Sequence, residues 1–235
     1  MTRISFFFMM ASFMSCAQPS PQFETEQLLG KKEISLAGDG YQLLPQAADA
    51  FEQMKAAAKK EGIKIKAVSS FRSYQRQRAI WNRKYKANAK AGLSPQKNIQ
   101  KIIEYSTIPG TSRHHWGTEI DIVDGAIPPE GDVLLTRKFH NSGPYEPLRK
   151  WLEAHAQDYG FICAYPDDSE RPGFSYEPWH YSYAPLSRPL YKAYLKLDLK
   201  EALSDLDMEG SNHLDQAFLM AYRESHVKGI NPALK

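Results

Sequence analysis

The chain has 235 residues, 42% of them hydrophobic and 24% charged, which is the composition of an ordinary globular protein with one domain-sized core. Its formal net charge is only +3, and the lysines and arginines are spread along the chain, which argues against a nucleic-acid-binding protein. The two cysteines, Cys16 and Cys163, do not imply a disulfide framework.

The N-terminus has the features of a secretory signal peptide. Arg3 precedes an almost wholly apolar run over residues 4–14, which is shorter than the roughly 20 residues that span a membrane. Cys16 lies where bacterial lipoproteins carry their lipidated cysteine, but the residues before it match that signal only loosely, so lipidation and simple cleavage both stay open. We therefore expect residues 1–16 to direct the protein to the cell envelope, either periplasmic or lipid-anchored. A polar, proline-containing stretch predicts a tether over residues 17–40.

The remaining chain alternates between helical and strand-like patterns. Apolar residues at helical spacing predict helices over 45–60, 74–89 and 147–159, a short helix over 99–103, a helical segment from about 190 to 206, and a last helix capped by Asn212. Alternating patterns or short apolar runs predict strands over 63–69, 118–123, 161–165 and 174–183. We expect a core over residues 41–189 and a C-terminal helical extension over 190–235 that packs on it.

These elements predict the fold class. Strands and helices do not alternate regularly, and no glycine-rich phosphate loop follows a strand, so a nucleotide-binding α/β fold is not expected. An α+β fold with a small, mainly antiparallel sheet and flanking helices fits the order better.

Two compact segments, residues 112–121 and 177–180, together hold the residues of a catalytic zinc site. His114, Asp121 and His180 offer two imidazoles and one carboxylate as ligands, and Glu177 is left as a base for a water molecule. On residue type alone, His115 rivals His114 and Glu119 rivals Asp121 as ligands.

Local geometry bears on whether these groups can meet. In the strand over 118–123, Asp121 points away from the face shared by Ile120 and Ile122. In a regular strand Glu177 and His180 would face opposite ways, but Pro178 lies between them and favours a local break. Such a break lets both side chains reach one cleft.

The order of these motifs resembles that of the VanY-type D-alanyl-D-alanine carboxypeptidases, a family of zinc peptidases. The resemblance covers about residues 41–185 and rests on three blocks: Ser69-Ser70-Phe71-Arg72-Ser73-Tyr74-Gln75-Arg76-Gln77, Ser112-x-His114-x-x-Gly117-x-x-x-Asp121 and Glu177-x-x-His180. All three together are specific, whereas one block alone is not. The resemblance also implies the hedgehog/D,D-peptidase-like form of the α+β fold.

The resemblance implies a role for each matched residue. His114, Asp121 and His180 would bind one zinc ion, and Glu177 would be the general base. Arg72 would hold the free carboxylate of the last substrate residue, because a guanidinium grips a carboxylate through two hydrogen bonds. Gln77 and Ser112 would also contact the substrate.

The expected function is release of the terminal D-alanine of peptidoglycan stem peptides by a zinc-dependent D,D-carboxypeptidase. An L,D-carboxypeptidase acting on tetrapeptide stems is an alternative, and so is a non-catalytic lipoprotein that binds wall peptides. The expected partner is the stem peptide, with no nucleic acid and no membrane contact other than a lipid on Cys16. The sequence does not indicate an oligomeric state.

Overall fold

A four-stranded antiparallel sheet forms the centre of the protein in a computed structural model that describes residues 23–235. The strands are β1 (Ile65–Ser69), β2 (Glu119–Asp124), β3 (Phe161–Cys163) and β4 (His180–Tyr183), in the spatial order β1-β2-β4-β3. The predicted α+β class is therefore confirmed. The predicted signal segment, Cys16 and residues 17–22 lie outside the described residues.

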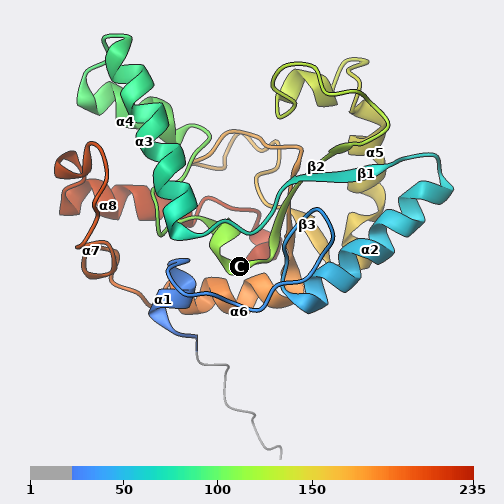
Figure 1. Ribbon diagram of the computed structural model, residues 1–235, viewed down its shortest axis with the longest axis horizontal. Helices are drawn as coiled ribbons and strands as arrows, with labels where there is room; N and C mark the ends of the chain where they lie inside the picture. The colour runs from blue at the N-terminus through green and yellow to red at the C-terminus, as the bar shows by residue number, and fades with distance from the viewer. Residues whose placement is uncertain (1–22) are drawn as a thin grey trace, which may run out of the picture.

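Eight α-helices surround this sheet within residues 23–235, and Figure 1 shows α2 and α5 on one side of the strands and α3, α4 and α8 on the other. In chain order they are α1 (Thr25–Leu28), α2 (Pro45–Lys60), α3 (Tyr74–Lys90), α4 (Pro95–Ile103), α5 (Glu146–His155), α6 (Ala184–Tyr194), α7 (Leu199–Ala202) and α8 (Gln216–Tyr222). None of the helices in this part of the chain combines the length and the apolar character that a membrane crossing needs.

The register between β2 and β4 divides the sheet into an apolar and a polar face. Asp121 pairs with His180, and Ile120 pairs with Tyr181. Because directly paired residues point to the same face, Ile120 and Tyr181 share the hydrophobic cluster that contains residues of α2 and α5. Asp121 and His180 consequently lie side by side on the opposite face.

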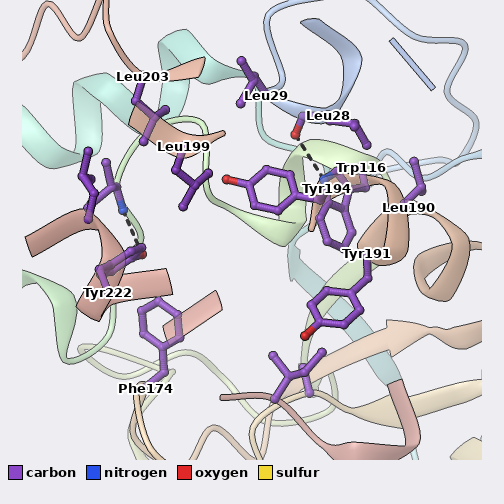
Figure 2. Packing of buried hydrophobic residues seen from close by; sticks show 14 of the residues in the cluster. Leu28, Leu29, Trp116, Phe174, Leu190, Tyr191, Tyr194, Leu199, Leu203 and Tyr222 are labelled. Atoms are coloured by element: carbon purple, nitrogen blue, oxygen red, sulfur yellow. Dashed lines mark hydrogen bonds between the residues drawn. The ribbon is translucent and has the colours of Figure 1, made fainter. Parts of the chain in front are cut away.

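The second hydrophobic cluster joins the N-terminal and C-terminal segments. Figure 2 shows Trp116 and Tyr194 at its centre, and the indole Nε1 of Trp116 donates a hydrogen bond to the carbonyl of Leu28 at 3.1 Å. Leu28 and Leu29 are buried, so the predicted tether over 17–40 is wrong from Thr25 onward. The proline-containing start of that stretch suggested a tether, but the leucines that follow it provide an apolar surface that the core takes up.

Several predicted boundaries differ from the structure because turns interrupt the patterns. The predicted strand over 174–183 is a strand only from His180, since Pro178 and Trp179 form a turn. The helix expected from residue 190 begins at Ala184 as α6 and ends at Tyr194. The last helix, α8, is capped by Asp215 rather than Asn212, because the Asp215 carboxylate accepts a hydrogen bond from the backbone N–H of Phe218 at 2.8 Å.

One residue of the C-terminal segment makes stability depend on pH. His226 stacks on Tyr222 with ring centroids 4.7 Å apart and meets the edge of Phe174. Burial lowers the pKa of His226 to about 4, whereas a histidine in an unfolded chain titrates near 6.5. Between these values the unfolded chain binds more protons, so we expect the free energy of unfolding to fall as the pH drops from about 6.5 to about 4.

Denaturant titrations at several pH values check this expectation. His226→Phe keeps an aromatic ring and removes the titration, so its free energy of unfolding should depend less steeply on pH across that window. Equal slopes for the variant and the wild type would contradict the assignment.

Candidate metal centre

Three buried side chains meet on the polar face of the sheet. His114, Asp121 and His180 each place one ligand atom so that all three atoms lie within 4.8 Å of one another. Asp121 and His180 come from paired strands, and His114 comes from η1 (Arg113–Trp116), the 3-10 helix before β2. His114 Nε2 lies 3.5 Å from Asp121 Oδ2, and His180 Nδ1 lies 3.5 Å from Asp121 Oδ1. The structure thus brings together the three ligands proposed from sequence.

Hydrogen bonds on the far side of each imidazole orient the nitrogen that faces the cluster. Nδ1 of His114 donates to the carbonyl of Ser70 at 2.7 Å, which leaves Nε2 as the lone-pair nitrogen. Nε2 of His180 donates to Glu119 Oε2 at 3.0 Å, which directs Nδ1 toward Asp121. Such partners are the ordinary support of metal-binding histidines, since they set both ring orientation and tautomer.

The donor set fits a zinc ion. Asp121 Oδ1 is buried and forms no hydrogen bond within the described part of the chain, so it is an unused acceptor aimed at the cluster. Two imidazole nitrogens and one carboxylate suit borderline-soft Zn²⁺, and three protein ligands leave a position for water or substrate. These residues can therefore hold a catalytic type of zinc site.

The carboxylates around His180 also favour a cation. Burial, reinforced by the positive charge of Arg72, lowers the pKa of His114 well below its usual value, so this imidazole is neutral. Burial raises the pKa of Asp121 to about 6. Burial opposes a charge on His180, yet the hydrogen bonds and charges of Glu119 and Glu177 outweigh it and raise its pKa to about 10. A cation is thus stabilised here, and a metal ion would displace the His180 proton.

Glu177 lies beside the proposed ligands. Its Oε2 atom is 3.0 Å from His180 Nδ1, and the side chain lines a cavity of about 500 Å³ together with His114 and Asp121. The turn at Pro178 and Trp179 is closed by a hydrogen bond from the backbone N–H of His180 to the carbonyl of Glu177 at 3.1 Å. In a regular strand the side chains of Glu177 and His180 would point to opposite faces. Because of this turn, both line the same cavity.

Arg72 lines the same cavity and keeps spare donors. Nη1 donates to Gln77 Oε1 at 2.8 Å and Nη2 donates to Ser69 Oγ at 2.9 Å. A guanidinium has five N–H groups, so others remain for a ligand. Ser112 also lines the cavity, and its buried Oγ atom has no hydrogen-bond partner within residues 23–235.

Gln77 is placed differently from the substrate contact that the resemblance implied. It is fully buried, is not part of the cavity wall, and its amide nitrogen donates to the carbonyl of Thr107 at 2.8 Å. Its amide oxygen accepts from Arg72. Gln77 therefore positions the guanidinium of Arg72 rather than facing the cavity.

The two rival residues have other roles. Nε2 of His115 accepts a hydrogen bond from the backbone N–H of Gly110 at 3.1 Å, and Nδ1 donates to the carbonyl of Arg72. Both ring nitrogens are used, so His115 supports the backbone of the Arg72 segment. Glu119 lies behind His180, where its other oxygen, Oε1, accepts from Arg113 at 3.0 Å and from Ser182 at 2.7 Å.

This buried network is the part of the site that sequence reasoning missed. A usable signal was present, since Glu119 and Asp121 are two residues apart on one strand and therefore share a face. The alternation placed Glu119 on the polar face, but only the pairing of β2 with β4 sets it against His180 and Ser182.

Comparison with known proteins assigns the family. The sequence model of the VanY family, D-alanyl-D-alanine carboxypeptidase, matches residues 40–186 and so covers the sheet, the proposed ligands, Glu177 and Arg72. The chain belongs to this family. The resemblance drawn from the three motifs is thereby confirmed.

Two curated relatives show the extent of the similarity. YodJ of Bacillus subtilis is 32% identical over 166 residues, which are 70% of this chain and 51% of YodJ. The bifunctional D-Ala-D-Ala dipeptidase and D-Ala-D-Ala carboxypeptidase VanXYC of Enterococcus gallinarum is 32% identical over 145 residues, 61% of this chain and 68% of VanXYC. The chain thus spans about half the length of YodJ and two thirds of VanXYC.

Two solved structures share the VanY-family fold. A mutant of the vancomycin resistance D,D-pentapeptidase VanY in complex with Zn(II) is 25% identical, with a TM-score of 0.52, and the match covers 73% of this chain and 89% of that one. The LdcB LD-carboxypeptidase is 29% identical, with a TM-score of 0.50, and the match covers 74% of each chain.

Proposed function

We propose that this protein is a zinc-dependent carboxypeptidase that releases the terminal D-alanine from peptidoglycan stem peptides. The observation that carries the proposal is the buried group of His114, Asp121 and His180, with Glu177 beside it and Arg72 in the same cavity. The VanY-family match and the similarity to a Zn(II)-containing VanY structure support both the metal and the reaction.

In this proposal His114 Nε2, a carboxylate oxygen of Asp121 and His180 Nδ1 hold the zinc ion. The ion supplies a Lewis acid that polarises the scissile carbonyl and acidifies water. Glu177 takes a proton from the attacking water and returns one to the leaving amine of D-alanine. Arg72, held by Gln77 and Ser69, binds the terminal carboxylate, and the Oγ of Ser112, which has no partner among the described residues, bonds the peptide.

A second candidate is an L,D-carboxypeptidase that acts on tetrapeptide stems. The similarity to the LdcB LD-carboxypeptidase favours it, because its identity of 29% is no lower than that of the D,D-enzyme structure. The two reactions differ in the configuration of the residue before the cleaved bond, while the zinc ligands, the base and the carboxylate clamp serve both.

The test is incubation of the zinc-loaded protein with defined pentapeptide and tetrapeptide stems, followed by mass spectrometry. We expect loss of one terminal D-alanine from one of them. Treatment with a chelator should abolish this release, and added Zn²⁺ should restore it. If zinc binds and neither peptide is shortened, the alternative of a non-catalytic wall-peptide-binding protein takes precedence.

A substitution of Arg72 tests the exopeptidase assignment. Arg72→Gln removes charge-assisted hydrogen bonds worth about 1.5–3 kcal/mol, so kcat/KM should fall roughly 10- to 100-fold, mainly through KM. A peptide with an amidated C-terminus should be a poor substrate for the wild type and lose little more in the variant. Equal losses for the free and amidated peptides would contradict a role as carboxylate clamp.

We further propose that the protein works in the cell envelope, where its substrate is found. The apolar run over residues 4–14 and the position of Cys16 support this location. Labelling with a radioactive fatty acid, compared between wild type and Cys16→Ala, distinguishes a lipid anchor from a cleaved signal.

A further inference from the structure

Two basic side chains of the cavity have no part in the proposed chemistry. Arg83 and Lys84 lie on α3 and line the same cavity as His114 and Glu177. Within residues 23–235, neither side chain forms an ion pair or a hydrogen bond, although other bases on α3 do: Arg78 pairs with Asp207, and Lys86 pairs with Glu209. Arg83 and Lys84 therefore line the cavity without a partner in this part of the chain and remain available to a ligand there.

Lys84 lies close to the groups of the proposed site. Side chains on a helix lean toward its N-terminus, and the segment before the N-terminus of α3 carries Arg72. Burial, with the positive charges of Arg72 and Arg83, lowers the pKa of Lys84, while the negative charges of Glu177 and Asp132 oppose that shift. The ammonium group is therefore half-buried and close enough to feel the charges of both the clamp and the proposed base.

The carboxylates near Lys84 interact with other groups, so an anionic ligand can bind to Lys84. Asp132 lines the cavity too, but its carboxylate accepts a hydrogen bond from the backbone N–H of Leu134 and forms no ion pair with Lys84. The carboxylates of Asp121 and Glu177 face the metal site. A divalent ion there would offset their charge, so a carboxylate on the ligand is the natural partner for Arg83 and Lys84.

We propose that Arg83 and Lys84 form a subsite for a second carboxylate of the peptide substrate, separate from the terminal carboxylate at Arg72. The inference rests on the proposed function and specifies its substrate as a peptide with at least two carboxylates. Stem peptides offer this chemistry in two places: the free α-carboxylate of a γ-linked glutamyl residue at position two, and the side-chain carboxylate of a diaminopimelyl residue at position three.

A panel of peptides and variants tests the subsite. Four stem peptides are compared. In the first, the carboxylates at positions two and three are both free; in the second and third, one of them is converted to the carboxamide; in the fourth, both are converted. The variants are Lys84→Met and Arg83→Gln, singly and together, with Lys90→Met as the matched control. Lys90 is an exposed base on the same helix and does not line the cavity.

We expect the wild type and Lys90→Met to prefer the fully charged peptide over the doubly amidated one by about tenfold in kcat/KM. The double variant should lose this preference, because the carboxylate and the bases then no longer interact. The singly amidated peptide that reproduces the loss identifies which carboxylate is bound. Equal rates for charged and amidated peptides in the wild type would overturn the subsite and leave the carboxypeptidase proposal intact.

Binding separates the two proposals if no peptide is hydrolysed. Calorimetric titration of the Glu177→Gln protein with the same peptides reports recognition without turnover. Tighter binding of the charged peptide that disappears with Lys84→Met and Arg83→Gln supports the subsite even where hydrolysis fails. Equal dissociation constants for charged and amidated peptides overturn it.

Discussion

Replacing Glu177 by Gln is expected to lower kcat by a factor of about 10²–10⁴ while leaving the zinc content unchanged, because the amide cannot accept the proton from water. Glu177 is not among the three proposed ligands, and its Oε2 atom lies against His180 Nδ1 at the cavity wall. The substitution keeps the size of the side chain and removes only its basicity, so KM should change little.

Elemental analysis for zinc and the rate of D-alanine release check this expectation together. Glu170→Gln is the matched control, since Glu170 is an exposed carboxylate in the loop before Glu177 and does not line the cavity. A Glu177→Gln protein that retained zinc and wild-type turnover would show that another group acts as the base.

The second large effect is expected when Glu119 is replaced, although this residue does not line the cavity. Glu119→Ala should weaken zinc binding about 10- to 100-fold, since removing the carboxylate frees the tautomer and the ring orientation of His180. It should also lower the free energy of unfolding by about 3–5 kcal/mol, because Arg113 is buried and loses its only ion-pair partner within the described residues.

The two effects can be separated. In a double variant, Arg113→Met with Glu119→Leu, the unpaired charge is gone, so stability should recover in part while zinc affinity stays low. Competition with a chelator measures the affinity, and denaturant titration of the metal-free protein measures the stability. Ser182→Ala is the control, since it removes one hydrogen bond to Glu119 but leaves the contact with His180. If the Glu119→Ala protein bound zinc as tightly as the wild type, Glu119 would have no role in zinc binding.

The candidate ligands were predictable from sequence because their geometry follows from local rules. Alternation along β2 set Asp121 on the face opposite Ile120, and the structure places it there. A proline cannot occupy a regular central strand, so Pro178 indicated the break that turns Glu177 toward His180. The choice of His114 over His115 came from the motif spacing and not from any local rule, since the two residues are adjacent in one 3-10 helix.

Other features could not be predicted because long-range packing overrides the local pattern. From sequence, the leucines after Thr25 were predicted to belong to a tether. In the structure, Trp116 and the C-terminal helices form the surface that buries them. Gln77 matched a substrate-contact position, yet the carbonyl of Thr107, 30 residues away, holds its amide inside the protein. In both cases the partner lies far along the chain.

By itself, the sequence determined the α+β class, the family, and which imidazoles and carboxylates are offered to a metal, because residue type, strand period and motif spacing are local properties. Only the tertiary structure decided how those groups are held. The strand pairing sets Glu119 behind His180, and the fold places Arg83 and Lys84 of α3 in the cavity wall. Hydrogen bonds and charge interactions act over a few ångströms in space, and the residues that they join to Glu119 lie up to 63 positions apart in the chain.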